Sequence, residues 1–297
     1  MPGSGLKKQT YSTGYRHSGV LQIEQTFYIK VIETLTRAQI PFLVGGGFAF
    51  ASYTGIARAT KDLDLLVSPE DFSRTMEACS AEGFEAKVRF AHWIGKVVQG
   101  EYVVDIIFSS GNGLCPVDSE WFQYAVPDNL FTRSVRLCPP EELIWSKAFV
   151  MERNRFDGAD IAHILSARGK ELDWARLLRR FHSHWRVLLS HLILYGYIFP
   201  SDSSKVPDWL MTELIRRIDV EKNNASFPER VCQGTLLSWS QYLPDIEERG
   251  YQDARHSPQG HFTKEQTVTL TNIFLEGEES SQCFYGTRDR VERPSRM

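Results

Sequence analysis

Two aspartates in one apolar run are the residues with the clearest chemical potential. Asp62 and Asp64 lie in the sequence DLDLLV, separated by a single leucine. Side chains alternate between the faces of a β-strand, so both carboxylates would project from the same side. Two like charges held close together repel each other, and hard cations such as Mg²⁺ bind oxygen ligands of this kind. The pair therefore indicates a metal site, with a surface cluster that also includes Arg58 and Lys61 as the alternative.

A glycine-rich turn precedes this pair by sixteen residues. The sequence GGG at 45–47 follows a short apolar run, and residues 48–53 are expected to begin a helix. Glycine lets backbone N–H groups approach a ligand, and a helix N-terminus favours anions. No Gly-Lys-Ser/Thr follows, which excludes a P-loop, and Phe50 interrupts a dinucleotide-binding pattern. The turn could hold a triphosphate beside the metal, or it could simply join a strand to a helix.

A third acid stands in a later apolar segment. Asp105 is flanked by valines and isoleucines in EYVVDIIF, residues 101–108, which is typical of a strand. If this strand lies beside the one that carries the aspartate pair, three carboxylates converge on one site. The alternative is a strand with one face toward water and Asp105 on that face.

Together these residues resemble the nucleotidyltransferase superfamily built on the DNA polymerase β palm. The wording VGGGFAFASYTGIARATKDLDLLV is most similar to its minimal and abortive-infection-type bacterial branches, and the resemblance covers roughly residues 20–167. It implies an α/β (α+β) fold with a palm-like mixed sheet and flanking helices, followed by a helical C-terminal domain.

The resemblance also implies a role for each motif. Asp62, Asp64 and Asp105 would bind two Mg²⁺ ions and form the catalytic set, and Asp105 would help to activate the attacking hydroxyl. Gly45 and Gly46 would contact the nucleoside triphosphate.

The resemblance implies further nucleotide contacts from a stretch before the aspartate pair and from Lys147 in a later helix. Lys147 is followed by Arg155-x-Asp157-x-x-Asp160, which is similar to an element of the abortive-infection branch. An ordinary helix lysine, with Asp157 as a helix cap, is the alternative explanation. These implied nucleotide-binding residues are Arg58, Thr60, Lys61 and Lys147.

Composition limits the class of protein. The chain has 297 residues, a net charge of −3 and 42% hydrophobic residues, so it can fill the cores of one large or two ordinary domains. The negative charge disfavours a protein that grips long nucleic acids. No run of eighteen apolar residues and no apolar signal core are present, so we expect a cytoplasmic protein without a membrane partner. The five cysteines form no Cys-x-x-Cys pair, which disfavours zinc and disulfide frameworks.

Apolar periodicity predicts the organisation of the chain. The expected domains are a flexible N-terminus at 1–19, a catalytic domain at 20–138, a mainly helical domain at 139–275 and a disordered tail at 276–297. Expected helices cover 21–38, 69–82, 140–153, 158–168, 173–182, 185–197 and 207–221, and expected strands cover 84–90, 93–98, 101–108, 121–126 and 134–137.

One basic and aromatic stretch has two interpretations. The stretch from Trp174 to Arg186 contains four arginines beside several apolar residues: Arg176, Arg179, Arg180 and Arg186. We expect the solvated face of a helix, with RNA binding as the alternative.

The sequence thus predicts a Mg²⁺-dependent nucleotidyltransferase that uses a nucleoside triphosphate such as ATP and releases pyrophosphate. An antitoxin-like protein that neutralises a toxin partner by modification or binding is the alternative. The acceptor (a small molecule, a protein or an RNA end) and the preferred base stay open.

Overall fold

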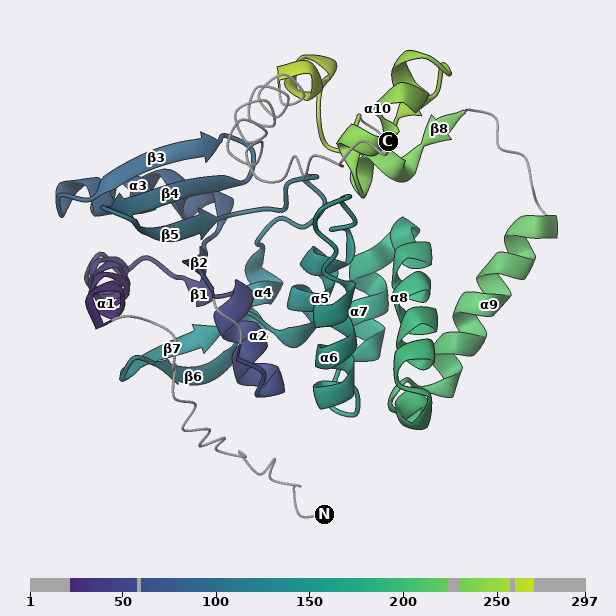
Figure 1. The fold of residues 1–297 in the computed structure, drawn as a ribbon, viewed down its shortest axis with the longest axis horizontal. Coiled ribbons are helices and arrows are strands. Elements are labelled where there is room, and N and C mark those ends of the chain that lie inside the picture. Colours follow the sequence, from purple (N-terminus) through teal and green to yellow (C-terminus); the bar gives the residue numbers. More distant parts are fainter. Residues whose placement is uncertain (1–21, 58–59, 224–229, 257–259, 270–297) are drawn as a thin grey trace, which may run out of the picture.

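The computed structural model describes residues 22–57, 60–223, 230–256 and 260–269. The two predicted tails, at 1–19 and 276–297, lie outside the described residues, and so does Arg58. Figure 1 shows a sheet on the left and a group of helices on the right, with a small unit from the C-terminal part above them. Among the described residues, no helix is both long and apolar enough to span a membrane.

A mixed seven-stranded sheet forms the first half of the fold, as predicted. The strand order is β3-β4-β5-β2-β1-β7-β6, in which β2 and β5 are parallel neighbours while β4 runs antiparallel to β5. The strands are β1 (Leu43–Val44), β2 (Asp62–Leu66), β3 (Glu85–Phe90), β4 (Ile94–Gln99), β5 (Tyr102–Ile107), β6 (Val126–Leu130) and β7 (Arg133–Leu137), and a separate pair is formed by β8 (Val231–Cys232) and β9 (Gln252–Asp253).

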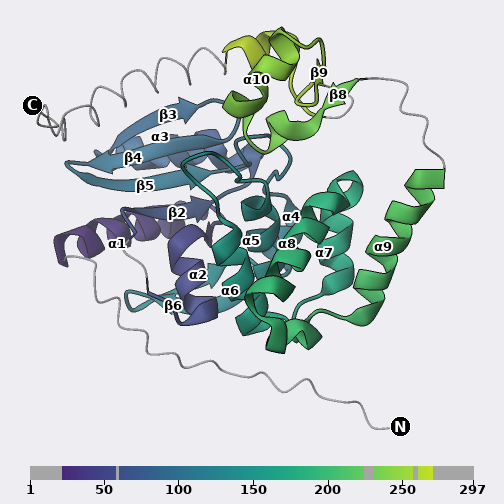
Figure 2. The ribbon, with the colours of Figure 1, turned by 45° about the vertical axis from the view of Figure 1, so that its right-hand side comes forward.

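Helices cover the sheet and build most of the second half, which confirms the mixed α/β fold class. Helix α2 packs against both β2 and α6, so it joins the sheet to the helical layer (Figure 2). The helices are α1 (Gln22–Arg37), α2 (Gly46–Thr54), α3 (Phe72–Ala81), α4 (Ser119–Gln123), α5 (Pro140–Ala148), α6 (Gly158–Arg168), α7 (Trp174–Phe181), α8 (Trp185–Ile198), α9 (Asp208–Asn223) and α10 (Trp239–Glu247), with short 3-10 turns η1 (Pro69–Asp71), η2 (His182–His184), η3 (Pro200–Lys205) and η4 (Gln233–Leu236).

The two faces of the central strands have different surroundings. Leu63 and Leu65 of β2 are fully buried, and they alternate with the two aspartates along the strand. On β4, a Cβ atom at Gly95 would lie 2.9 Å from Met76 of α3, so α3 presses closely on that face. The next residue, Lys96, must therefore point to the opposite face. The sheet thus buries one face under helices and presents its charged residues on the other.

Two predicted elements are wrong. Residues 121–126 are not a strand: α4 occupies 119–123, and the carboxylate of Asp118 accepts a hydrogen bond from the Glu120 N–H at its first turn. The helix predicted at 140–153 ends at Ala148. The chain then reverses through a bridge between Met151 and Phe156, because the Met151 N–H donates to the Leu237 carbonyl instead of continuing the helix.

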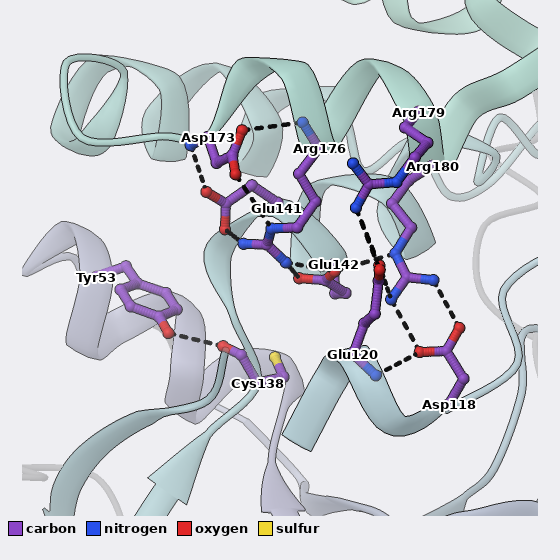
Figure 3. A network of polar contacts seen from close by, with 10 residues as sticks. All are labelled: Tyr53, Asp118, Glu120, Cys138, Glu141, Glu142, Asp173, Arg176, Arg179 and Arg180. Carbon is purple, nitrogen blue, oxygen red and sulfur yellow. Dashed lines mark hydrogen bonds and ion pairs between the residues drawn. The ribbon is translucent and has the colours of Figure 1, made fainter. Parts of the chain in front are cut away.

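A buried ionic network joins α7 to the start of α5 (Figure 3). The Arg176 side chain is only 4% exposed, and its guanidinium donates to Glu142 at 2.6 Å and to Glu141 at 2.5 Å. Arg180 donates to Asp118 at 2.6 Å and to Glu142 at 3.1 Å. The prediction of a solvated arginine face is therefore wrong for these two residues. Their neutralised charges also remove much of the basis for the RNA alternative.

Candidate active site

The three predicted carboxylates are brought together by neighbouring strands. Asp64 of β2 lies directly opposite Asp105 of β5 in the parallel register, and Asp62 lies two residues before Asp64. Directly paired residues project from the same face of a sheet, as do residues two apart on one strand. Asp105 is 7% exposed, while the other two are partly buried. The alternative in which Asp105 faces open water is therefore wrong.

Burial and the two neighbouring carboxylates together determine the electrostatics of Asp64. Burial, followed by the charges of Asp62 and Asp105, raises the pKa of Asp64 from 3.8 to about 7. The charges of Lys147 and Arg155 lower the same pKa, but by less than the other effects raise it. The Asp64 carboxylate therefore carries a negative charge that its protein surroundings do not fully compensate.

A lysine that the sequence analysis did not single out pairs with the third acid. Lys96 of β4 lies directly opposite Asp105 of β5, and its Nζ is 2.7 Å from Asp105 Oδ1. Burial raises the pKa of Asp105, and the Lys96 ammonium partly offsets this rise. The signal in the sequence was a single charged residue within the apolar strand segment at 93–98.

The described residues hold no metal-type cluster. Among them, no group of three or more His, Cys, Asp or Glu side chains is arranged to hold a metal ion. Oδ1 of Asp105 accepts a hydrogen bond from the Lys96 ammonium.

The glycine turn lies directly against Asp64. Gly46 has a φ of +50°, and a Cβ atom there would lie 1.6 Å from Asp64 Oδ2, so only glycine fits. Helix α2 begins at this residue, and its N-cap, Gly45, supplies no side-chain hydrogen bond. The start of α2, whose first N–H groups have no partner within the helix, therefore lies beside the Asp64 carboxylate.

The residues just before β2 shape the approach to the first carboxylate. The Thr60 hydroxyl lies 2.9 Å from the Asp62 carbonyl and 3.3 Å from Asp62 Oδ1, and it also faces Gly47. Lys61 is exposed. Thr60 thus stabilises the backbone and side chain of Asp62.

Lys147 of α5 lies at the edge of the site but already has two partners. Its Nζ is 2.8 Å from Asp157 and 2.9 Å from Asp160, and its side chain is 13% exposed. Burial lowers the pKa of Lys147, but the two acids more than offset this, so the pKa lies above its ordinary value. Asp157 therefore anchors the lysine as well as preceding α6.

Arg155 is a cation of this region to which the sequence analysis gave no role. Its guanidinium contacts Asp157 at 3.1 Å while the side chain stays 66% exposed. The hydrogen bond with Asp157 raises the pKa of Arg155, and the charges of Asp64 and Asp62 add to the effect. Arg155 thus remains accessible on the side of the carboxylates.

A cavity of about 280 Å³ opens beside these groups. Gly46, Asp64 and Lys147 are among its lining residues, together with other residues of α5 and the segment 235–239. Most of its wall is apolar, with the aromatic side chains of Trp93, Trp121, Trp239 and Phe262.

No family model matches the chain, and no curated protein matches it. Solved structures show a partial likeness. The crystal structure of ANT(2″)-Ia in complex with adenylyl-2″-tobramycin is 18% identical, with a TM-score of 0.42 over 55% of this chain and 99% of that chain. The lincosamide antibiotic adenylyltransferase LnuA with bound lincomycin is 17% identical, with a TM-score of 0.37 over 50% and 99%. An antigenic nucleotidyltransferase-like protein from Paracoccidioides brasiliensis is 15% identical, with a TM-score of 0.39 over 63% and 95%.

Proposed function

We propose that this protein transfers a nucleoside monophosphate from a nucleoside triphosphate to an acceptor hydroxyl. The acceptor oxygen would form a bond to the α-phosphorus, the bond from that phosphorus to the bridging oxygen would break, and pyrophosphate would leave. The observation that carries the proposal is the register of Asp64 with Asp105 beside a glycine turn that tolerates no side chain. Uncompensated carboxylates beside an anion-favouring helix N-terminus suit cation-assisted phosphate chemistry.

The proposed role of the chain itself is mainly to position the substrate. Gly46 has no side chain, so the backbone could approach the terminal phosphates closely. The N–H groups at the start of α2 would then donate to these phosphates. The accessible guanidinium of Arg155, which lies in the connection between α5 and α6, would also contact the phosphates. Lys147 would reach a phosphate only by giving up one of its two carboxylate partners, so we assign it mainly to anchoring.

The chemistry of the three carboxylates suits Mg²⁺, although among the described residues they are not arranged as a metal-binding group. Asp62, Asp64 and Asp105 offer hard oxygen ligands on one face, and burial together with the charges of Asp62 and Asp105 raises the pKa of Asp64. When bound, Mg²⁺ would supply charge neutralisation and would acidify the attacking hydroxyl. A full ligand set would require Asp105 to share its carboxylate between Lys96 and the ion.

Asp105 is proposed to act on the acceptor side. Lys96 contacts its Oδ1, which leaves Oδ2 to accept the proton of the acceptor hydroxyl. Lys96 would hold the carboxylate in the orientation for this step, as a positioning residue.

The experiment that tests the proposal uses the full chain with each α-³²P-labelled nucleoside triphosphate, with MgCl₂ or EDTA, and a cell extract as the source of acceptor. We expect labelled product and released pyrophosphate only with Mg²⁺, and their loss in Asp62→Asn. Equal product in EDTA, or full transfer by this variant, would contradict the assignment. The antitoxin-like alternative has no supporting residue set in the described part of the chain.

A further inference from the structure

A second cavity lies at the other end of α2 from the carboxylates. It has a volume of about 250 Å³, and Ser52 and Tyr53 from the end of α2 line it. Gly46, the first residue of this helix, lies instead against Asp64 in the first cavity, beside the carboxylates. Among the described residues, none lines both cavities. The second cavity is therefore separate from the proposed phosphate site.

Most charged groups of the second cavity neutralise one another. Arg176 donates to Glu141 at 2.5 Å, and Arg168 pairs with Glu171 at 2.9 Å. Figure 3 shows the first of these pairs. The Glu141 carboxylate also accepts a hydrogen bond from the Asp173 N–H, so both of its oxygens are engaged. The two pairs thus contribute no net charge to the cavity.

Asp128 of β6 is the lining acid that remains after this pairing. It is partly buried, and its carboxylate accepts from the Ser52 hydroxyl and from the Asn129 N–H, which are both neutral donors. Burial raises the pKa of Tyr53, and the charge of Asp128 adds to this rise. With three acids and two arginines in its lining, the cavity carries a net charge of −1. A ligand with one positive charge would balance it.

The rest of the lining is mainly apolar. Val126, Pro127, Leu137 and Pro140 line the cavity together with the ring of Tyr124, which is 41% exposed. Contact with such side chains removes the hydrocarbon part of a ligand from water, which is favourable. The lining therefore suits a molecule that combines one positive charge with an apolar body.

We propose that the second cavity binds a small organic monocation, with its ammonium group beside Asp128 and its apolar body against Tyr124 and Pro127. Asp128 would repel an anion, and the two lining arginines already donate to acids. A bare metal ion would need about six oxygen ligands, whereas one carboxylate of the described lining has no cationic partner. The volume lies just below the range of about 300–1,000 Å³ for drug-sized ligands, which favours a molecule with one ring. This site does not depend on nucleotidyl transfer.

Three probes of similar shape and different charge test the proposal on the wild-type full chain. They are 2-phenylethylamine, which is a cation at neutral pH, the neutral 2-phenylethanol and the anion 3-phenylpropanoate, and calorimetry with ligand-observed NMR measures their affinities. We expect the amine to bind about 10-fold to 100-fold more tightly than the alcohol, because its hydrogen bond to Asp128 is charge-assisted. The anion should bind most weakly. Undetectable binding of the amine, equal affinity for amine and alcohol, or tighter binding of the anion would overturn the proposal.

Two matched variants test the location of the site. Asp128→Asn removes the charge and keeps an oxygen for the Ser52 hydroxyl, so it should weaken amine binding by about 10-fold to 100-fold and leave alcohol binding nearly unchanged. Glu152 also accepts from a serine hydroxyl, that of Ser238, but it lines the first cavity. Glu152→Gln should therefore keep wild-type affinity for the amine. Loss of amine binding in Glu152→Gln but not in Asp128→Asn would place the amine in the first cavity and overturn the assignment.

A nucleotide analogue tests whether the two cavities are independent. With saturating Mg²⁺ and α,β-methylene-ATP, the amine should remain bound, because no described residue lines both cavities. Competitive displacement of the amine would contradict the assignment. Amine binding by a chain that never binds the analogue would support the second cavity and count against nucleotidyl transfer, so the two proposals fail separately.

Discussion

Replacing Asp64 with asparagine should stabilise the metal-free protein at neutral pH. The pKa of this carboxyl rises from 3.8 to about 7 through burial and through repulsion from Asp62 and Asp105. A carboxyl whose pKa is higher in the folded state binds its proton more tightly there than in the unfolded chain. The contribution of this carboxyl to the free energy of unfolding is therefore fully present below about pH 4 and is lost as the pH rises through about 7.

The size of this loss follows from the shift. About three pKa units at roughly 1.4 kcal/mol each give an upper limit of about 4 kcal/mol above pH 7. An amide at this position keeps the size of the side chain but removes the charge. Asp64→Asn should therefore gain up to that amount relative to wild type at pH 8, and almost nothing at pH 4.

Urea unfolding of both proteins in EDTA, followed by fluorescence between pH 4 and pH 8, measures this difference. The control is Asp118→Asn, since the paired Arg180 holds the pKa of Asp118 below its usual range against the opposing effect of burial. That variant should lose stability above pH 4, the opposite sign. A free energy of unfolding for Asp64→Asn that follows the wild-type pH dependence in parallel would refute the reasoning.

Three further predictions concern the glycine turn, the third acid and the buried network. Gly46→Ala should lower the free energy of unfolding by roughly 1–2 kcal/mol, because this residue has a left-handed backbone. The added methyl group should also displace Asp64, so calorimetry should detect no Mg²⁺–triphosphate binding. Wild-type affinity would contradict the proposed contact. Asp105→Asn should bind triphosphate normally yet transfer on the order of 10²-fold more slowly, and an unchanged rate in the pyrophosphate assay would exclude a catalytic role. Arg176→Met should cost roughly 3–5 kcal/mol in urea unfolding because Glu142 is left buried without this partner, and adding Glu142→Leu should recover part of that loss; no recovery would show that the pair is not the cause.

Sequence periodicity predicted most strands of the sheet and most helices because it reports which face of each element is buried. Asp62 and Asp64 were placed on one strand face by alternation alone. The contact of that strand with the one that carries Asp105 could only be conditional, because strand order depends on how distant segments pack. The structure supplies this link through the parallel pairing of β2 with β5.

The errors share a physical origin, which is that local patterns do not encode long-range partners. Arg176 and Arg180 follow helical spacing that is equally typical of a solvated face, and only the approach of α5 and α4 converts them into buried ion pairs. Lys96 was overlooked for the same reason, since its partner Asp105 lies on the adjacent strand. The early end of α5 depends on a hydrogen bond to Leu237, almost ninety positions along the chain.

The charges around the proposed site argue that an anionic substrate needs a cation in order to bind. Asp62, Asp64 and Asp105 project from one face, and Lys96 forms its ion pair with Asp105. Lys147 is engaged by two acids of its own, so it adds little free positive charge. A triphosphate placed at the α2 N-terminus would meet this negative surface, and Coulomb repulsion at such short range is large in a partly buried setting. The charges of Asp62 and Asp105, which add to the effect of burial on the pKa of Asp64, would thus favour simultaneous binding of Mg²⁺ and triphosphate over binding of either alone.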